Sequence, residues 1–223
     1  MIERIVPAGT RTSEAYEDLP EARLFPEEEP IVKSAVAKRR GEFTTARHCA
    51  RQALTRLGAP AGAILTGERG APLWPEGVVG SITHCEGYRA AVVARTADVL
   101  SIGVDAEPAL PLPEGVLEAV ALPDEQIMVK ELLETAPEVP WDRLLFSAKE
   151  SVYKAWFPLT RRFLEFEEAR LHFGRAEGTP LEGTFTARLL AGPAPAGGRT
   201  LHTFDGRWLV ADGIVLSSVT VLA

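Results

Sequence analysis

The sequence predicts an α+β fold in which helices and short antiparallel strands are divided between two halves of similar length. Two segments, 43–57 and 142–157, carry apolar residues at helical spacing. Residues 78–94 contain two short apolar runs joined by a turn, a pattern typical of a β-hairpin. A stretch with three prolines, 108–115, then divides the 223-residue chain near its middle.

The N-terminal half, residues 1–107, is expected to contain one long helix. Its apolar stripe is formed by Phe43, Ala46, Ala50, Ala53, Leu54 and Leu57. Gly58 follows as a suitable stop, because glycine adopts the left-handed conformation that commonly ends a helix. Arg47 and Arg51 are four residues apart, so the helix places them on one face beside the stripe.

Three strands are expected in the same half. Residues 78–83 and 90–94 form the hairpin, and residues 101–107 form a third strand. Side chains alternate in a strand, so Asp105 and Glu107 share one face, opposite the apolar residues Ile102, Val104 and Ala106. The sequence therefore predicts two carboxylates side by side on one strand.

The proline-rich segment 108–115 is interpreted as a linker to a C-terminal half, residues 116–223. Helical patterns follow at 124–135 and 142–157, and the chain has strand-like character from Phe163 onward.

The helix at 142–157 is expected to begin with Asp142 as its N-cap and to stop before Pro158. Its buried stripe comprises Leu145, Ala148, Val152 and Ala155. Ser147, Glu150 and Lys154 lie together on another face. A surface pair between Glu150 and Lys154 would also explain this spacing, so the pattern alone leaves both alternatives open.

Composition excludes several classes of protein. The hydrophobic fraction of 46% and charged fraction of 25% are those of a globular domain. The formal charge of −7 argues against a general nucleic-acid binder and against a protein that coats anionic membranes. Two cysteines cannot form a disulfide framework, the N-terminus has charges where a signal peptide needs an apolar run, and no apolar stretch is long enough to span a membrane. We expect a soluble, cytoplasmic protein.

The charges are unevenly distributed along the chain. Residues 14–29 hold seven acids against Arg23 alone, whereas residues 33–56 hold seven bases against Glu42 alone. Two interpretations follow: the segments pair with each other as solvated faces, or the basic segment forms a phosphate site within an acidic protein.

Standard motifs for dinucleotide binding, phosphate loops and serine hydrolases are absent. His48-Cys49 and His84-Cys85 lack the spacing of a zinc site, so the cysteines are interpreted as small core residues. The Asp105-x-Glu107 pair is more informative, because Mg²⁺ takes one or two carboxylates together with substrate phosphates. An exposed strand face beside an arginine is the ordinary alternative.

Three blocks in order resemble the 4′-phosphopantetheinyl transferase family. They are Gly80-Ser81-Ile82-Thr83-His84-Cys85, Gly103-Val104-Asp105-Ala106-Glu107 and Phe146-Ser147-Ala148-Lys149-Glu150-Ser151-Val152-Tyr153-Lys154. Arg69-Gly70-Ala71-Pro72 resembles the family's G-x-P loop, and the basic helix resembles bacterial members that serve siderophore, polyketide and nonribosomal peptide pathways. The resemblance covers about residues 30–175. The sequence differs from the family pattern at Phe146, where many members have Trp.

The resemblance implies a fold of two similar subdomains with pseudo-twofold symmetry and coenzyme A bound between them. It implies transfer of 4′-phosphopantetheine from coenzyme A to a serine of an apo acyl, peptidyl or aryl carrier protein, with release of adenosine 3′,5′-bisphosphate. A chain that holds both halves of the site has no need to dimerise, so we expect a monomer. The alternatives are another Mg²⁺-dependent phosphoryl-transfer or nucleotide-hydrolysing enzyme, and a non-catalytic module whose basic helix binds an acidic protein.

The resemblance also implies roles for the acidic residues. Asp105, Glu107 and Glu150 would hold Mg²⁺ against the pyrophosphate. Glu150, directly or through a water on the metal, would take the proton of the acceptor serine. Lys154 would stabilise charge on the leaving group or supply a proton to it. Asp105, Glu150 and Lys154 are therefore the expected catalytic residues.

For coenzyme A itself, the resemblance implies that Lys149 and His84 hold phosphates and that Arg39 and Arg47 bind the ribose phosphate. Arg69, with the backbone of Gly70, would border the adenosine end, while Ser81 either contacts a phosphate or only ends a strand. The expected coenzyme A contacts are Arg39, Arg47, Arg69, Gly70, Pro72, Ser81, His84, Asp105, Lys149 and Lys154.

Overall fold

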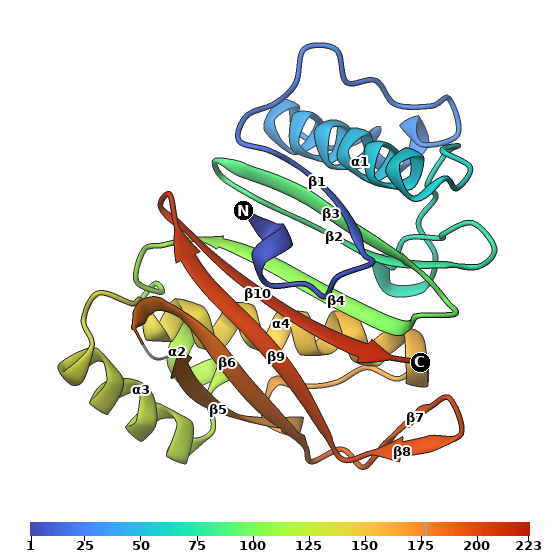
Figure 1. Ribbon diagram of the computed structural model, residues 1–223. Helices are drawn as coiled ribbons and strands as arrows, with labels where there is room; N and C mark the ends of the chain where they lie inside the picture. Colours follow the sequence, from blue (N-terminus) through green and yellow to red (C-terminus); the bar gives the residue numbers. More distant parts are fainter. Residues whose placement is uncertain (177) are drawn as a thin grey trace.

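The computed structural model describes residues 1–176 and 178–223 and combines two antiparallel sheets with two long helices. In Figure 1, α1 (Ala37–Leu57) and a three-stranded sheet lie above a five-stranded sheet and α4 (Trp141–Thr160). The α+β class is confirmed, and each half packs one long helix against one sheet.

The smaller sheet has the strand order β1–β3–β2. It consists of β1 (Arg11–Ala15), β2 (Val78–Cys85) and β3 (Tyr88–Arg95). The predicted hairpin is confirmed as β2 and β3. Helix α1 covers this sheet through Cys49, Ala50, Ala53 and Leu54, which are buried with Ala91 and Val93 of β3. The helix begins six residues before the predicted start, because its basic first turn carries no apolar stripe.

The larger sheet has the order β4–β10–β9–β6–β5. Its strands are β4 (Val99–Pro108), β5 (Ala169–Ala176), β6 (Thr179–Leu189), β9 (Thr203–Ala211) and β10 (Ile214–Leu222). A small hairpin of β7 (Ala194–Ala196) and β8 (Arg199–Leu201) stands beside it. The short helices are η1 (Ile2–Arg4), η2 (Glu29–Val32), η3 (Glu68–Gly70), α2 (Val116–Val120), α3 (Pro123–Thr135) and η4 (Phe166–Glu168).

Strand β4 forms its backbone ladder with the C-terminal strand β10, from Glu107 opposite Val215 to Gly103 opposite Val219. The predicted division into residues 1–107 and 116–223 with a linker at 108–115 stays a prediction, but it assigns this strand to the N-terminal half. The chain instead passes from the smaller sheet to the larger sheet between β3 and β4, after Arg95.

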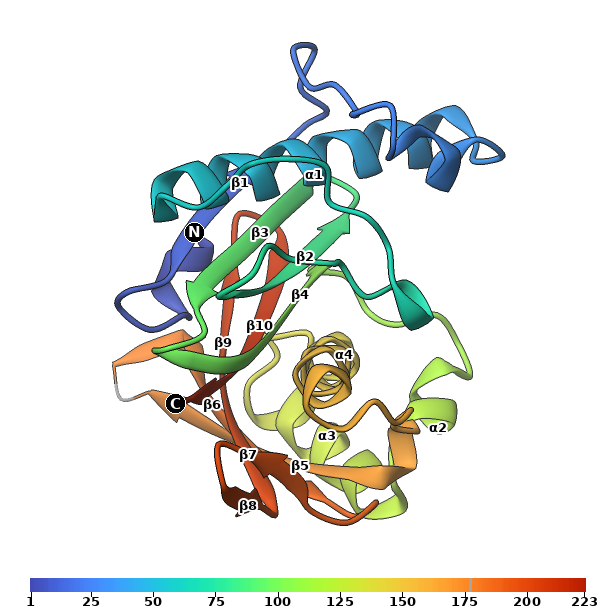
Figure 2. The same cartoon turned by 90° about the vertical axis from the view of Figure 1, so that its right-hand side faces the viewer.

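Helix α4 lies against the face of β4 that carries Asp105 and Glu107 (Figure 2). The predicted stripe of Leu145, Ala148, Val152 and Ala155 is fully buried. Gly103 allows the close approach, because a Cβ there would overlap the Ser151 carbonyl oxygen of α4. The Asp142 N-cap prediction is wrong, since Pro140 precedes the helix and Asp142 accepts a hydrogen bond from the Leu112 amide at 2.7 Å. The helix also continues through Pro158, near its end.

The two sheets meet where β2 lies beside β4, and side-chain hydroxyls replace a backbone ladder at this joint. The Val104 amide donates to Ser81 Oγ at 3.0 Å, and the Ala106 amide donates to Thr83 Oγ1 at 2.9 Å. All of these groups are buried. The joint therefore fixes the hairpin of one half against the strand of the other. Within residues 1–176 and 178–223, no helix combines the length and apolar character needed to cross a membrane.

Candidate active site

A cavity of about 590 Å³ lies between the two halves. The N-terminal half contributes the loop 68–74 and residues 78–82 of β2, and the C-terminal half contributes residues 100–102 of β4. Helix α4 completes the lining with a stripe of side chains at helical spacing, which are Glu150, Tyr153, Lys154, Phe157, Pro158 and Arg161, the last just beyond the helix end. The lining thus joins the loop, hairpin and helix motifs that are far apart in the sequence.

Six of the predicted site residues line this cavity: Arg69, Gly70, Pro72, Ser81, Glu150 and Lys154. Arg69 and Gly70 have positive φ angles of 51° and 83°, so a sharp turn presents them at the cavity. Ser81 also serves the joint between the sheets, so its hydroxyl already accepts one hydrogen bond within the protein.

Asp105 lies beside the cavity in an ion pair with Lys154. The Lys154 Nζ is 2.7 Å from Asp105 Oδ1 and donates to the Val104 carbonyl oxygen at 3.1 Å. The Thr83 hydroxyl also donates to Asp105 Oδ1, at 3.4 Å. The second oxygen, Oδ2, is buried and has no hydrogen-bond partner among the residues that the structure describes. Such an orphaned carboxylate oxygen is costly unless a ligand satisfies it.

Glu150 has no hydrogen-bond or ion-pair partner in the described part of the chain, although it is only partly exposed. Burial raises the pKa of Glu150, the nearby Lys154 opposes this, and the negative charge of Asp105 adds to it. A raised carboxylate pKa of this origin is typical of acids gathered for a function.

Glu107, a predicted metal ligand, forms an ion pair with an arginine of α4. Its Oε2 is 3.0 Å from Arg143 Nη1 of α4, and the same arginine donates to the carbonyl oxygens of Leu110 and Pro111. Burial raises the pKa of Glu107, followed by the charge of Asp105. In the described chain no three acidic, histidine or cysteine side chains are grouped closely enough to hold a metal ion. The charge of Asp105 therefore acts on both glutamates, but the three carboxylates do not form a ready-made cage.

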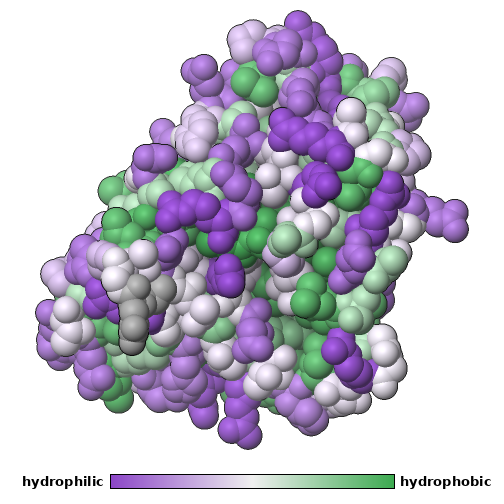
Figure 3. Space-filling model, viewed as in Figure 1, coloured by the Kyte–Doolittle hydropathy of each residue, from purple (hydrophilic) through white to green (hydrophobic). Residues whose placement is uncertain are grey.

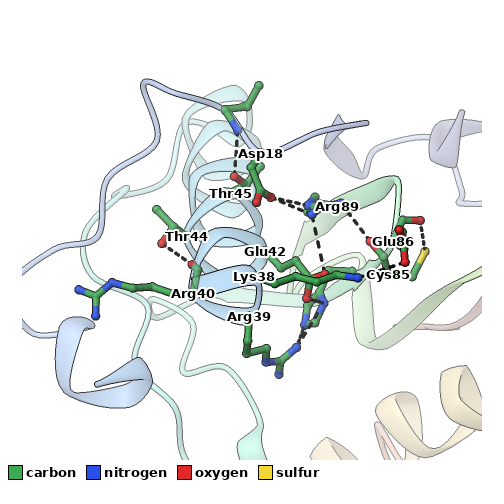
Figure 4. Close-up of polar contacts among 12 residues, drawn as sticks. Asp18, Lys38, Arg39, Arg40, Glu42, Thr44, Thr45, Cys85, Glu86 and Arg89 are labelled. Carbon is green, nitrogen blue, oxygen red and sulfur yellow. Dashed lines mark hydrogen bonds and ion pairs between the residues drawn. The ribbon is translucent and has the colours of Figure 1, made fainter. Parts of the chain in front are cut away.

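The basic start of α1 meets the end of the β2–β3 hairpin in a charged cluster (Figure 4). Arg39 contacts the ring nitrogens of His84, and Glu42 Oε2 is 3.5 Å from His84 Nδ1. Arg89 pairs with Asp18 at 2.8 Å, and Lys38 pairs with Glu86 at 3.1 Å. Burial, followed by the charge of Arg39, lowers the pKa of His84 to about 4. Arg39, predicted to bind the ribose phosphate, and His84, predicted to hold a phosphate, therefore lie together, at the opposite end of β2 from the cavity.

Arg47, in contrast, is turned inward. It is 5% exposed, its Nε donates to the Ile64 carbonyl oxygen at 3.0 Å, and its Nη2 donates to Thr66 Oγ1 at 3.3 Å. Burial lowers the pKa of Arg47 to about 10. Its neighbour Arg51 pairs with Glu28 at 2.9 Å, so one pair links the acidic and basic segments.

Lys149, predicted to hold a phosphate, lies in the interior of the protein. Lys149 is 3% exposed, and its Nζ lies 2.7 Å from Glu125 Oε2 of α3. It also donates to the carbonyl oxygens of Phe166 and Ala169 at 2.7 and 3.0 Å. All three donors of the ammonium group are thus used within the protein, on the side of α4 turned away from the cavity.

Comparison with sequence families gives two matches that divide the chain where the sheets divide. Residues 27–94 match the 4′-phosphopantetheinyl transferase N-terminal domain, and residues 101–195 match the 4′-phosphopantetheinyl transferase superfamily. The 4′-phosphopantetheinyl transferase Svp of Streptomyces mobaraensis is 52% identical, with the match covering 100% of this chain and 90% of that protein.

The chain belongs to the 4′-phosphopantetheinyl transferase family. It is a transferase that activates carrier proteins, as predicted. The 4′-phosphopantetheinyl transferase Npt of Nocardia iowensis is 51% identical over 98% of this chain and 99% of that protein. The 4′-phosphopantetheinyl transferase PptT of Mycobacterium tuberculosis is 48% identical over 94% of this chain and 91% of that protein. These matches exclude the alternative of a non-catalytic binding module.

Sequence reasoning missed three residues in or beside this cavity. Thr83 bonds Asp105, Tyr153 lines the cavity, and Arg161 lines it from the residue after α4. The alternation of β2 could have identified Thr83, because it shares a face with Ser81. Tyr153 and Arg161 lie on the same helical face as Glu150 and Lys154, and following this face at spacings of three and four residues would have found both. Phe146, where the resemblance departs from the family's Trp, packs against Phe166 with ring centroids 5.9 Å apart.

Proposed function

We propose that this transferase moves the 4′-phosphopantetheine group of coenzyme A to a serine hydroxyl of an apo acyl, peptidyl or aryl carrier protein. The new bond joins the serine oxygen to the phosphorus next to the pantetheine, and the bond from that phosphorus to the bridging oxygen breaks. Adenosine 3′,5′-bisphosphate leaves. The observation that carries this proposal is the cavity between the halves, where Glu150 and Lys154 face the loop 68–74 with Asp105 beside them.

The residues at this site fit a magnesium ion. Within the described residues, Asp105 has a buried oxygen without a partner and the Glu150 carboxylate has no hydrogen-bond or ion-pair partner. Mg²⁺ typically takes one or two carboxylates plus substrate phosphates. Glu107 fits only if it leaves Arg143. A bound ion would neutralise the pyrophosphate and act as a Lewis acid.

The remaining steps belong to side chains of the transferase. Glu150 would accept the proton of the attacking serine, and its raised pKa suits a general base better than that of an ordinary glutamate. Lys154 would stabilise the negative charge that develops on the leaving bisphosphate. Arg39 and His84 would bind the ribose phosphate, and Arg69 and Gly70 would border the nucleotide. One chain supplies the whole lining, which supports a monomeric enzyme.

The carriers served are proposed from relatives. Enterobactin synthase component D of Salmonella typhimurium is 31% identical, with the match covering 86% of this chain and 76% of that protein. We propose carriers of siderophore, polyketide or nonribosomal peptide synthesis as acceptors.

Mass spectrometry of an apo carrier protein tests the transfer directly. After incubation with the enzyme, coenzyme A and Mg²⁺, the carrier should gain about 340 Da, the mass of one phosphopantetheine added covalently. Glu150→Gln should remove the labelling while leaving the melting temperature close to that of the wild type. Consumption of nucleotide without labelling would indicate a hydrolase and would contradict the proposal.

A further inference from the structure

The cavity contains a cation that neither the motifs nor the proposed mechanism uses. Arg161 ends α4, eleven residues after Glu150 and seven after Lys154. At 1.5 Å per residue the three side chains form a stripe about 16 Å long on one side of the helix. The arginine therefore faces the same space as the residues assigned to the pyrophosphate.

The backbone at Arg161 is unusual for an arginine. Its φ is 55° and its ψ is 21°, which places it in the left-handed region as the C-cap of α4. A residue with a side chain is disfavoured there relative to glycine, which is the common choice at this place in a helix. Only three non-glycine residues of the described chain have positive φ; two of them, Arg69 and Arg161, line this cavity from opposite halves, and the third is Asp212. Strained conformations of this kind tend to gather at functional sites.

The guanidinium of Arg161 is also uncommitted. Among the described residues it has no hydrogen-bond or ion-pair partner, and the guanidinium carbon lies 6.0 Å from the centre of the Phe157 ring. The other two cations of the lining are engaged: Lys154 is paired with Asp105, and Arg69 stacks on Phe163 at 4.9 Å. Lys149, the other lysine of the helix motif, is buried and forms an ion pair with Glu125.

We propose that Arg161 is a further coenzyme A-binding residue whose guanidinium contacts a phosphate of the bound molecule. This inference rests on the proposed function, because it takes coenzyme A as the occupant of the cavity. Guanidinium suits the role since it presents several donors in a plane and can bind phosphate with two at once. A side chain useful to the ligand would explain why arginine, and not glycine, ends the helix.

The decisive variant is Arg161→Gly, because it removes the side chain and relieves the backbone at the same time. The melting temperature should rise by about 2–4 °C, as expected for relief of a left-handed residue in a chain of this size. The KM for coenzyme A should increase about tenfold to hundredfold, the usual effect of losing a charge-assisted hydrogen bond. Asp212→Gly is the control: it replaces the third non-glycine residue of positive φ, in the β9–β10 turn away from the cavity, and should leave the KM unchanged.

Dephospho-coenzyme A identifies which phosphate Arg161 contacts. An equal increase in KM for both substrates assigns the contact to the pyrophosphate, whereas an increase confined to coenzyme A assigns it to the ribose phosphate. A KM for coenzyme A within threefold of the wild type in a stabilised Arg161→Gly protein would overturn the proposal and leave Arg161 as a helix cap. Failure of the wild type to label any carrier would instead contradict the proposed function.

Discussion

At the scale of single residues, charge and burial determine which predicted groups remain available to a ligand. Lys149 and Arg47 carry the charge expected of phosphate ligands, yet their polar atoms bond to Glu125 and to backbone carbonyls. Hydrophilic side chains dominate the surface over α1 and the loop before it (Figure 3). The basic segment therefore contributes specific exposed residues, Arg39 above all, and not a general phosphate-binding face.

His84 should make the stability of the folded protein depend on pH. Its pKa is about 4 in the folded state, against 6.5 when unfolded, because burial and four cations disfavour the charged ring. The cations are Arg39 and Arg47 of α1, Arg89 of β3 and Lys154 of α4, while Glu42 faces the ring at 3.5 Å. The unfolded chain binds the extra proton between these values, so stability is lost as the pH falls below 6.5 and the loss levels off below 4.

Urea unfolding at pH 7.5 and pH 5 measures this contribution. The free energy of unfolding should fall by about 2 kcal/mol more in the wild type than in His84→Gln, whose side chain does not titrate. An identical pH dependence in the two proteins would show that His84 is protonated equally in the folded and unfolded states.

At the scale of secondary structure elements, local sequence patterns predicted the helices and the hairpin well. The apolar stripe of α4 and the division of β4 into an apolar face and a face with Asp105 and Glu107 depend only on neighbouring residues, and both are confirmed. The partners of these elements could not be predicted in the same way. Glu125 is 24 residues before Lys149 in another helix, and β10 is more than 100 residues after β4. Local spacing carries no information about such contacts.

The buried pair of Lys149 and Glu125 fixes α4 against α3 and β5. Glu125 also accepts hydrogen bonds from the Leu122 and Leu171 amides, at 2.8 and 2.7 Å. Lys149→Met should reduce the free energy of unfolding by about 3–5 kcal/mol, because it leaves the Glu125 charge buried and unpaired. Adding Glu125→Gln should restore part of the stability, since the amide is neutral and still accepts a hydrogen bond.

Steady-state kinetics of the Lys149→Met/Glu125→Gln protein test whether Lys149 only stabilises the interior or also binds coenzyme A. The KM for coenzyme A should stay within threefold of the wild type, because the lysine does not face the cavity. A tenfold increase in KM together with unchanged stability would instead return Lys149 to the phosphate site.

At the scale of the whole molecule, the site exists because the two halves are held in one relative position. The loop 68–74 belongs to one half and α4 to the other, and the joint between β2 and β4 links them. Sequence motifs supplied six of the lining residues, among them Glu150 and Gly70. They could not supply the joint, because it depends on hydroxyl groups bonding to the backbone of a strand in the other sheet.

Replacing Ser81 by Ala and Thr83 by Val together should loosen this joint. The substitutions leave the buried amides of Val104 and Ala106 without acceptors, at a cost of about 1–3 kcal/mol each. Thr83→Val also removes a donor from Asp105. Hydrogen exchange at residues 101–107 should become faster than in the wild type, and the KM for coenzyme A should rise because the two walls of the cavity no longer hold a fixed spacing.

Thr186→Val provides the control, because this exposed threonine of β6 also donates to an aspartate, Asp205 at 3.4 Å, but lies in the larger sheet away from the joint. It should leave exchange in β4 and the KM unchanged. If exchange at residues 101–107 is as slow in the double variant as in the wild type, the apolar core shared by Val92, Val104 and Leu216 is sufficient to hold the halves together. A rise in KM without faster exchange would then assign the effect to the cavity itself, through the contact of Thr83 with Asp105 or through Ser81, which lines the cavity.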